Sequence, residues 1–269
     1  MEDPALDPDI EAFYSRLGEN DRLVVPPDGR LEYLRTQILL RRLMDGENLR
    51  VLDVGGGTGV HSAWLAKDGH AVTLVDPVAA QVEAARTLNG VEAVTGDARK
   101  LEFDSGFFDV VLMLGPLYHL VDREDRLAAL REGRRVVRDG GLLAVATINR
   151  ASAWFDELTR ESTGDPEQEP TIDEGAAHFE TGVLDLVAKG IFTRAYFHRP
   201  QDIAEEFTAA GLPAPHQYQI EGQLAWSPHL ASILDDPAQR EGALRMTELM
   251  EADPSLLGVG PHLLSAVRK

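Results

Sequence analysis

From residue 49 onward, short apolar segments alternate with amphipathic helical segments. The expected strands cover residues 50–54, 71–75, 91–95, 109–114 and 141–148, and the expected helices between them lie near 59–67, 77–88 and 123–138. Buried strands that alternate with helices are typical of βαβ units, in which parallel strands share one sheet. The sequence therefore predicts an α/β fold with helices on both faces of a mostly parallel sheet.

The rest of the chain departs from this alternation, and the departures divide the sequence into four parts. These are an N-terminal helical cap at 1–48, a core at 49–150, an inserted lid segment at 151–199, and a C-terminal part of the core at 200–269. Within the last part, expected strands at 216–221 and 262–268 flank a second helical insertion at 222–260. In the cap, one apolar helix stripe is expected from Leu31, Leu34, Ile38 and Leu39.

Charge and composition exclude several classes of function. The chain has 269 residues and a formal net charge of −19, and so acidic a surface repels the phosphate backbone of nucleic acids. It contains no cysteine, which excludes disulfides, thiolate nucleophiles and cysteine metal sites. The first ten residues are acidic, and no apolar run is long enough to span a membrane. We therefore expect a cytoplasmic protein with no nucleic-acid or membrane partner; the sequence does not specify an oligomeric state.

A glycine-rich motif, LDVGGGTG at residues 52–59, follows the first expected strand. Gly55, Gly57 and Gly59 predict a tight turn at which a ligand can approach the backbone and the start of a helix. Asp76 ends the second expected strand, 23 residues after Asp53, where a carboxylate can accept the hydroxyl protons of a ribose. A nicotinamide-dependent enzyme would share both features, but its fingerprint needs a small residue where this chain has Val60.

Together with Gly96-Asp97-Ala98 after the third expected strand and FDVVLMLGPLYHL at 108–120, these residues resemble the class I S-adenosylmethionine (SAM)-dependent methyltransferases. The resemblance covers residues 49–150 and extends to 200–269. It implies a Rossmann-like sheet of seven strands in the order 3-2-1-4-5-7-6, with the last strand antiparallel. The ligand of such a sheet binds at the switch point between strands one and four.

The resemblance also implies the roles of individual residues. The backbone at Gly55, Gly57 and Gly59 would hold the methionine part of SAM, and Asp53 would orient its amino group. Asp76 would hold the ribose, and Asp97 with Ala98 would meet the adenine. The implied cofactor-binding residues are completed by Pro77, Leu114 and Gly115. S-adenosylhomocysteine would be the product.

Residues that act on the methyl acceptor are expected after the fourth strand, in Gly115-Pro116-Leu117-Tyr118-His119. His119 is the candidate general base because imidazole titrates near neutral pH, with Tyr118 beside it. Packing against adenosine is an alternative role for both side chains. Methyltransferases of adenine or amide nitrogens carry an Asp/Asn-Pro-Pro-Tyr/Phe motif here, and this chain lacks its side-chain amide or carboxylate.

Two further expectations concern metals and the acceptor. The positions at which catechol-type enzymes of this fold bind Mg²⁺ hold Gly115-Pro116 and Ile148-Asn149 here, so we expect metal-independent transfer. The cap and the two insertions should converge over the ends of the strands as a lid. Candidate substrate-binding residues in these parts are Tyr14, His178, Tyr196, His198 and Trp226, and alternative bases are His178, His198 and Glu180.

Methylation of a small molecule, in a biosynthetic pathway, is the function that these features favour. Methylation of a peptide or protein is the second hypothesis, and it would need an open groove in place of a closed pocket. The third hypothesis is a SAM-binding protein that does not transfer methyl groups. The identity of the acceptor atom, O, N, S or C, is not specified by the sequence.

Overall fold

The computed structural model describes residues 6–16, 19–159, 171–187 and 192–269. Its central sheet has seven strands in the order β3-β2-β1-β4-β5-β9-β8. These strands are β1 (Arg50–Val54), β2 (Ala71–Asp76), β3 (Val91–Thr95), β4 (Phe108–Met113), β5 (Val137–Ile148), β8 (His216–Gln219) and β9 (His262–Arg268). All pairings from β3 to β5 are parallel, whereas β9 is antiparallel to both of its neighbours. The expected order of strands is confirmed.

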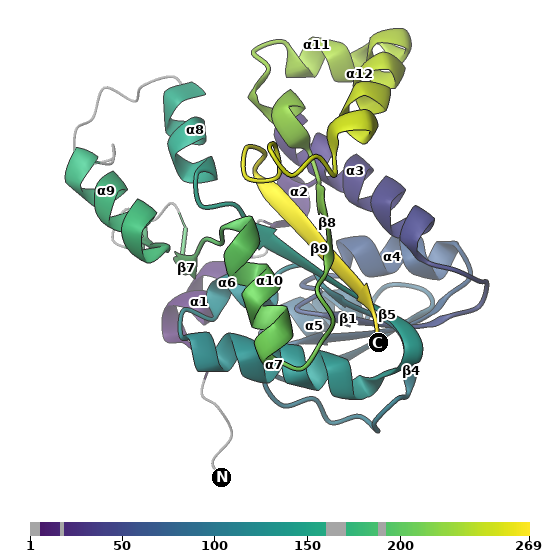
Figure 1. The fold of residues 1–269 in the computed structure, drawn as a ribbon. Coiled ribbons are helices and arrows are strands. Elements are labelled where there is room, and N and C mark those ends of the chain that lie inside the picture. Colours follow the sequence, from purple (N-terminus) through teal and green to yellow (C-terminus); the bar gives the residue numbers. More distant parts are fainter. Residues whose placement is uncertain (1–5, 17–18, 160–170, 188–191) are drawn as a thin grey trace.

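Helices cover both faces of this sheet (Figure 1). One face packs against α3 (Pro27–Leu43), α4 (Val60–Lys67) and α5 (Ala79–Ala85), and the other against α6 (Pro116–His119), α7 (Arg123–Val136) and α10 (Pro200–Ala209). Strands that are buried on both faces of a sheet are usually apolar along their length. In β1 every residue after Arg50 is buried, and Asp53 is the one polar residue among them. No helix in the described part of the chain is long and apolar enough to cross a membrane.

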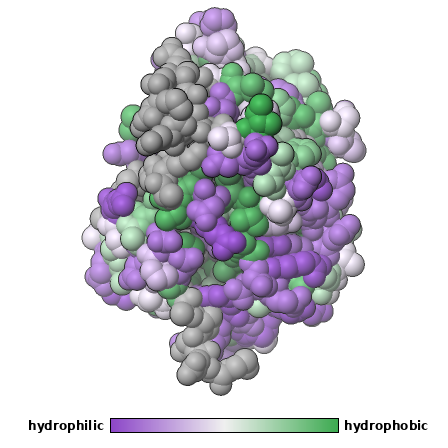
Figure 2. Space-filling model, turned by 90° about the vertical axis from the view of Figure 1, so that its left-hand side faces the viewer, coloured by the Kyte–Doolittle hydropathy of each residue, from purple (hydrophilic) through white to green (hydrophobic). Residues whose placement is uncertain are grey.

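The remaining elements belong to the expected cap and insertions. They are α1 (Pro8–Tyr14), α2 (Glu19–Arg22), α8 (Ser152–Thr159), α9 (Ile172–Thr181), β6 (Val183–Asp185), β7 (Arg194–Tyr196), the 3₁₀ helix η1 (Gly222–Trp226), α11 (Leu230–Asp235) and α12 (Pro237–Met250). In Figure 1, α8, α9, α11 and α12 lie beyond the edge of the sheet at which β5 ends and β9 begins. Figure 2 shows hydrophobic side chains near the middle of the face that bears α8 and α9, between hydrophilic ones.

Several details differ from the expectations. The antiparallel hairpin of β6 and β7 was not predicted, because strands of three residues carry too short a pattern of alternation. The last strand but one ends at Gln219 and not at 221, and β5 begins at Val137 through an irregular register opposite Phe108. In α3 the buried face includes Leu31 and Leu39 but also Arg35, whereas Leu34 and Ile38 are only partly buried. Hydrophobicity alone could not assign an arginine to the core.

A buried ion pair joins two helices on one face of the sheet. Arg126 on α7 and Glu206 on α10 are each 2% exposed. The guanidinium donates from Nε and Nη2 to Oε1 of Glu206, at 2.9 and 2.8 Å, and from Nη1 to two backbone carbonyls at the end of α6 and the loop after it. Every polar atom of this pair therefore has a close partner, which a buried ion pair requires.

This pair generates a prediction for stability. Arg126→Leu should lower the free energy of unfolding by about 3–5 kcal/mol, because it leaves the Glu206 carboxylate buried without its cation. Arg131→Leu on the same helix is the matched control, since its side chain is 51% exposed and its nearest carboxylate lies 3.8 Å away. We expect a change of at most about 0.5 kcal/mol for this control. Urea denaturation of both variants tests the prediction, and equal midpoints would contradict it.

Candidate active site

A cavity of about 610 Å³ lies at the carboxyl ends of β1 to β4. Its size is within the range of small-molecule sites. The predicted cofactor residues that line it are Asp53, Gly55, Gly57, Asp76, Pro77, Asp97, Ala98, Leu114 and Gly115. The fold thus brings together side chains and backbone from four strand ends. Gly59 is the exception, because it does not line the cavity.

The glycine-rich turn holds its shape because it lacks side chains. Gly55 has a φ of 69° and its N–H donates to the carbonyl of Val75 at 2.7 Å. A Cβ atom on Gly55 would lie 3.0 Å from the ring of Pro116. Gly59 is the N-cap residue of α4 with a φ of 87°, and a Cβ there would meet Leu88 at 2.5 Å. Gly59 therefore packs the start of α4 against Leu88, and its contact with a ligand stays a prediction.

Asp76 is fixed at the end of β2 by backbone donors. The N–H of Gly57 donates to its Oδ2 and the N–H of Val78 to its Oδ1, both at 2.9 Å. Burial raises the pKa of this carboxyl, and the two hydrogen bonds oppose that shift. Each carboxylate oxygen can accept more than one hydrogen bond, so Asp76 keeps capacity for hydroxyl groups in the cavity.

Asp53 and Asp97 add two acidic groups to the same cavity. Asp53 is 1% exposed and accepts a hydrogen bond of 2.7 Å from Ser62, and burial raises its pKa to about 6. Asp97 is held by Arg99, which donates to both carboxylate oxygens at 2.9 and 2.7 Å. Three carboxyl groups around one cavity favour a ligand with positive charge.

Gln81 is a site residue that the sequence reasoning missed. Its Nε2 donates to the backbone carbonyl of Tyr14 at 2.7 Å, whereas its buried Oε1 has no hydrogen-bond partner among the described residues. Gln81 lines the cavity and is 1% exposed. A buried acceptor without a partner is costly unless a ligand donor or water completes it. The signal was a polar residue in the helix that directly follows Asp76.

A second cavity of about 750 Å³ lies beneath α8, α9 and η1. Aromatic and apolar side chains from the insertions form most of its wall, among them Trp154, Phe155, Phe179, Phe192, Phe197 and Trp226. The predicted substrate residues Tyr14, His178 and Trp226 line it. Trp226 is oriented by a hydrogen bond of 2.8 Å to the carbonyl of Val259, and its ring lies against Phe155.

Tyr196 and His198 line neither cavity. The hydroxyl of Tyr196 accepts from Arg150 at 3.0 Å, and its ring packs under the guanidinium of Arg126. His198 is fully buried with Nε2 3.3 Å from Glu206. Tyr196 and Nε2 of His198 therefore belong to the ion network around Arg126, Arg150 and Glu206. Glu180 is exposed on α9 and lines neither cavity.

Tyr118 and His119 lie on α6, at the wall of the first cavity. Nε2 of His119 is 2.8 Å from the hydroxyl of Tyr14, and Nδ1 is 3.1 Å from the hydroxyl of Thr193. Burial lowers the pKa of His119 to about 3, so its ring is neutral at physiological pH. The role of His119 as general base stays a prediction. With both ring nitrogens bonded and so low a pKa, the structure favours a different proton acceptor.

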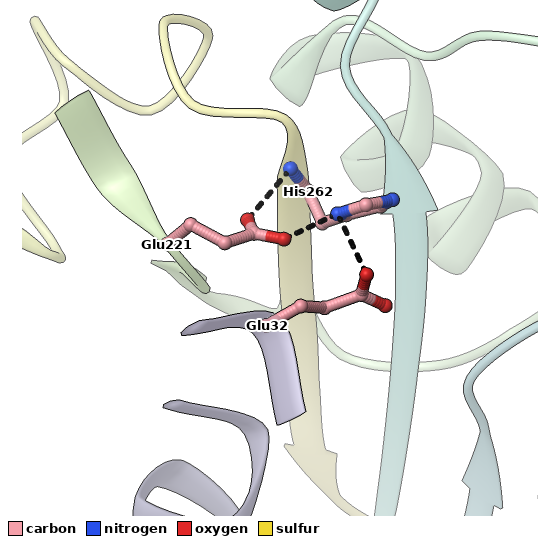
Figure 3. Close-up of side chains that lie close together, drawn as sticks. All are labelled: Glu32, Glu221 and His262. Atoms are coloured by element: carbon pink, nitrogen blue, oxygen red, sulfur yellow. Dashed lines mark hydrogen bonds and ion pairs between the residues drawn. The ribbon is translucent and has the colours of Figure 1, made fainter. Parts of the chain in front are cut away.

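One group of described residues outside the predicted set brings acidic and imidazole ligand atoms within 4.8 Å of one another. It consists of Glu32, Glu221 and His262, and Figure 3 shows how they meet from α3, the end of β8 and the start of β9. Glu32 and His262 also line the first cavity, and His262 lines the second. No motif or spacing connects these three residues, because Glu32 lies in the cap and the other two flank the insertion at 222–260.

Comparisons with known proteins agree with this architecture. Residues 51–141 match the family described as "Methyltransferase domain". A 2-methyl-6-phytyl-1,4-hydroquinone methyltransferase of Oryza sativa is 34% identical over 49% of this chain and 41% of its own length. A ubiquinone biosynthesis O-methyltransferase of a Caulobacter strain is 34% identical over 45% of this chain and 52% of its own length. The chain thus spans about half the length of the curated relatives it matches.

Solved structures share the fold over most of the chain. A SAM-dependent methyltransferase from Thermotoga maritima aligns with a TM-score of 0.59 at 19% identity, covering 96% of this chain and 99% of its own. An S-adenosylmethionine-dependent methyltransferase from Mesorhizobium loti aligns with a TM-score of 0.57 at 20% identity, covering 87% and 98%. At these identities the likeness concerns the fold alone.

Proposed function

We propose that this chain, which belongs to the class I, Rossmann-like family of SAM-dependent methyltransferases, transfers a methyl group from SAM to a small molecule. The observation that carries the proposal is the pair of adjoining cavities. One is lined by the glycine turn and by acidic residues that include Asp53, Asp76 and Asp97, and the other mostly by aromatic and apolar side chains. Tyr14, Arg22, Tyr118 and His262 line both.

The residues of the first cavity fit SAM. Gly55 and Gly57 leave the backbone open to the methionine part, and Asp53 would accept from its amino group. Asp76 would accept from the ribose hydroxyls, and Gln81 supplies a further acceptor in the same wall. Asp97 and Ala98 would meet the adenine. SAM supplies a methyl group on positively charged sulfur, and the acidic cavity stabilises that charge.

The second cavity would hold the acceptor. Its wall is mostly aromatic, so it favours a largely apolar molecule, and the insertions that form it would exclude water and align the acceptor with the methyl group. We infer that 151–199 and 222–260 act as the lid over it. The relatives named for hydroquinone and ubiquinone biosynthesis support a small, ring-containing acceptor.

A peptide acceptor is the second candidate, and one relative favours it. The cypemycin N-terminal methyltransferase of a Streptomyces species is 43% identical over 37% of this chain and 41% of its own length. Such a peptide would have to insert its N-terminus into the cavity beneath α8 and α9. A test of function should therefore include peptides with free N-termini beside small molecules.

The direct test is methyl transfer itself. With methyl-labelled SAM and a panel of phenols, amines, thiols and short peptides, we expect formation of S-adenosylhomocysteine that depends on a small-molecule acceptor, detected by mass spectrometry. Turnover with peptides alone would favour the second candidate. Cofactor binding without transfer to any acceptor would contradict the proposed activity.

The assignment of the ribose site gives a prediction for affinity. Asp76→Ala should weaken binding of S-adenosylhomocysteine by about 1.5–3 kcal/mol, the range for hydrogen bonds to a charged group. Asp104→Ala, which removes one exposed carboxylate outside the cavity, is the matched control and should bind normally. Calorimetric titration measures both. Equal affinity of the two variants would mean that Asp76 does not hold the ligand.

The assignment of the acceptor cavity gives a separate prediction. Trp226→Ala removes a wall of the second cavity that is absent from the lining of the first. It should raise KM for the acceptor by roughly tenfold or more, because it removes aromatic contact area, and leave the affinity for S-adenosylhomocysteine within about twofold. Steady-state kinetics and calorimetry separate the two effects. A loss of cofactor affinity equal to the loss of acceptor affinity would refute the division between cavities.

A further inference from the structure

The wall between the two cavities contains one imidazole with a free nitrogen. Of the four residues that line both cavities, only His262 carries an imidazole, whose ring nitrogens can each hold or release a proton. Its Nε2 has no hydrogen-bond partner among the described residues and points away from the carboxylates that hold its other nitrogen (Figure 3). Methyl transfer has to occur where the cofactor and the acceptor meet. His262 lies at this boundary, because it lines both cavities.

Two carboxylates hold this ring in place. Oε1 of Glu221 lies 2.5 Å from Nδ1 of His262, and Oε2 of Glu221 accepts the backbone N–H of His262 at 3.1 Å. Oε2 of Glu32 lies 4.0 Å from the same Nδ1. Glu221 is only 2% exposed, so little water competes for these bonds. The arrangement keeps a proton on Nδ1 and leaves Nε2 on the side of the ring that faces away from both carboxylates.

We propose that the methyl acceptor carries an acidic hydroxyl of the phenol type and that His262 shares the proton of this hydroxyl. The inference rests on the proposed function and names the chemistry of its acceptor. If the acceptor enters as a neutral phenol, its O–H bond breaks and the proton passes to Nε2 of His262. If the acceptor enters as a phenolate, Nε2 already carries a proton and pairs with the negative oxygen. The acceptor oxygen then forms the bond to the methyl carbon as the carbon–sulfur bond breaks, with the electron pair remaining on sulfur.

The charges around the ring bring the pKa of His262 close to that of a phenol. Burial alone would lower the pKa of His262, but the carboxylates of Glu221 and Glu32 and the hydrogen bond to Glu221 outweigh it and raise the pKa to about 9, with Arg22 opposing them. A phenol hydroxyl titrates near 10, so the two groups compete closely for one proton. An aliphatic alcohol holds its proton far more tightly. An ammonium acceptor would be repelled by the imidazolium.

A divalent cation in the same cluster is less compatible with the geometry. Two ligand atoms that each lie about 2.0–2.2 Å from a metal are separated by roughly 3 Å. Nδ1 of His262 and Oε1 of Glu221 are closer than that, at a distance typical of a charge-assisted hydrogen bond. Arg22 also donates to Glu32 at 2.6 Å and occupies the carboxylate with a cation of the chain itself. A proton therefore holds this cluster together.

The first experiment measures the proton without turnover. In the protein with S-adenosylhomocysteine bound, NMR titration should show His262 protonated through pH 8, and Glu221→Gln should lower its pKa by more than one unit because a carboxylate charge is lost. Titration of His262 below pH 7 in the unaltered protein would overturn the proposal. A shift of its signals on addition of Zn²⁺ or Mg²⁺ alone would overturn it in favour of a metal site.

The second experiment uses 4-nitrophenol as a chromogenic phenol. Below the pH at which the free phenol ionises, binding should increase the visible absorbance of the phenolate, because the imidazolium pairs with it. His262→Asn should abolish the increase and weaken binding roughly 10- to 100-fold. His229→Asn, an exposed histidine outside both cavities, is the matched control. An unchanged spectral shift in His262→Asn would overturn the proposal.

Calorimetry with S-adenosylhomocysteine distinguishes a failure of the role of His262 from a failure of the proposed methyltransferase function. Both histidine variants should keep their affinity for it within about twofold, which also shows that they fold. If all variants bind it and transfer methyl to a phenol at the same rate, the role of His262 fails and the proposed function stands. If the unaltered protein neither binds it nor transfers methyl groups, the proposed function fails first.

Discussion

The turn between β1 and α4 is the constraint on which the site depends. Its backbone passes so close to Pro116, Leu74 and Leu88 that a Cβ atom at Gly55, Gly56 or Gly59 would lie 2.5–3.0 Å from one of these side chains. Only this close passage allows the N–H of Gly57 to reach Asp76 on the neighbouring strand. The turn therefore fixes the acid at the end of β2 and leaves an open cavity beside it. Side chains from three further strand ends complete that cavity.

Buried ion pairs connect distant parts of the chain. The chain is strongly acidic, and yet Arg35, Arg126 and Arg150 are at most 5% exposed. Each bonds a carboxylate from a distant part of the chain: Glu251, Glu206 and Asp202 respectively. Because a buried guanidinium needs all its donors satisfied, such pairs specify one docking geometry better than apolar contact alone. The pair of Arg35 with Glu251 joins the cap to the insertion at 222–260. Arg150 also donates to the carbonyls of Phe197 and Phe179 in the insertion at 151–199, at 2.8 and 3.3 Å.

Local sequence patterns predicted the secondary structure and the glycine turn. They did not predict the contacts between side chains that lie far apart in the sequence. The strands and the glycine turn followed from apolar periodicity and motif spacing, and the order of the strands followed from the resemblance to the class I methyltransferases. Tyr196 and His198 had the right chemistry and the right segment, but Arg126 and Glu206 engage them elsewhere. Glu221 and His262 escaped notice because their meeting depends on the pairing of β8 with β9. Two polar residues at facing ends of adjacent strands were the available signal.

The reversed direction of β9 has a consequence for how such a chain can diversify. Because β9 runs antiparallel to β5, His262 begins the strand beside Ile148, at the edge where the parallel strands end. Glu221, η1 with Trp226, and His262 all belong to one hairpin, formed by β8, β9 and their long connection. That hairpin packs at the opposite end of the sheet order from β1 to β3. Substitutions in the connection between β8 and β9, at the far end of the sheet from β1 to β3, can therefore change the second cavity without touching the glycine turn.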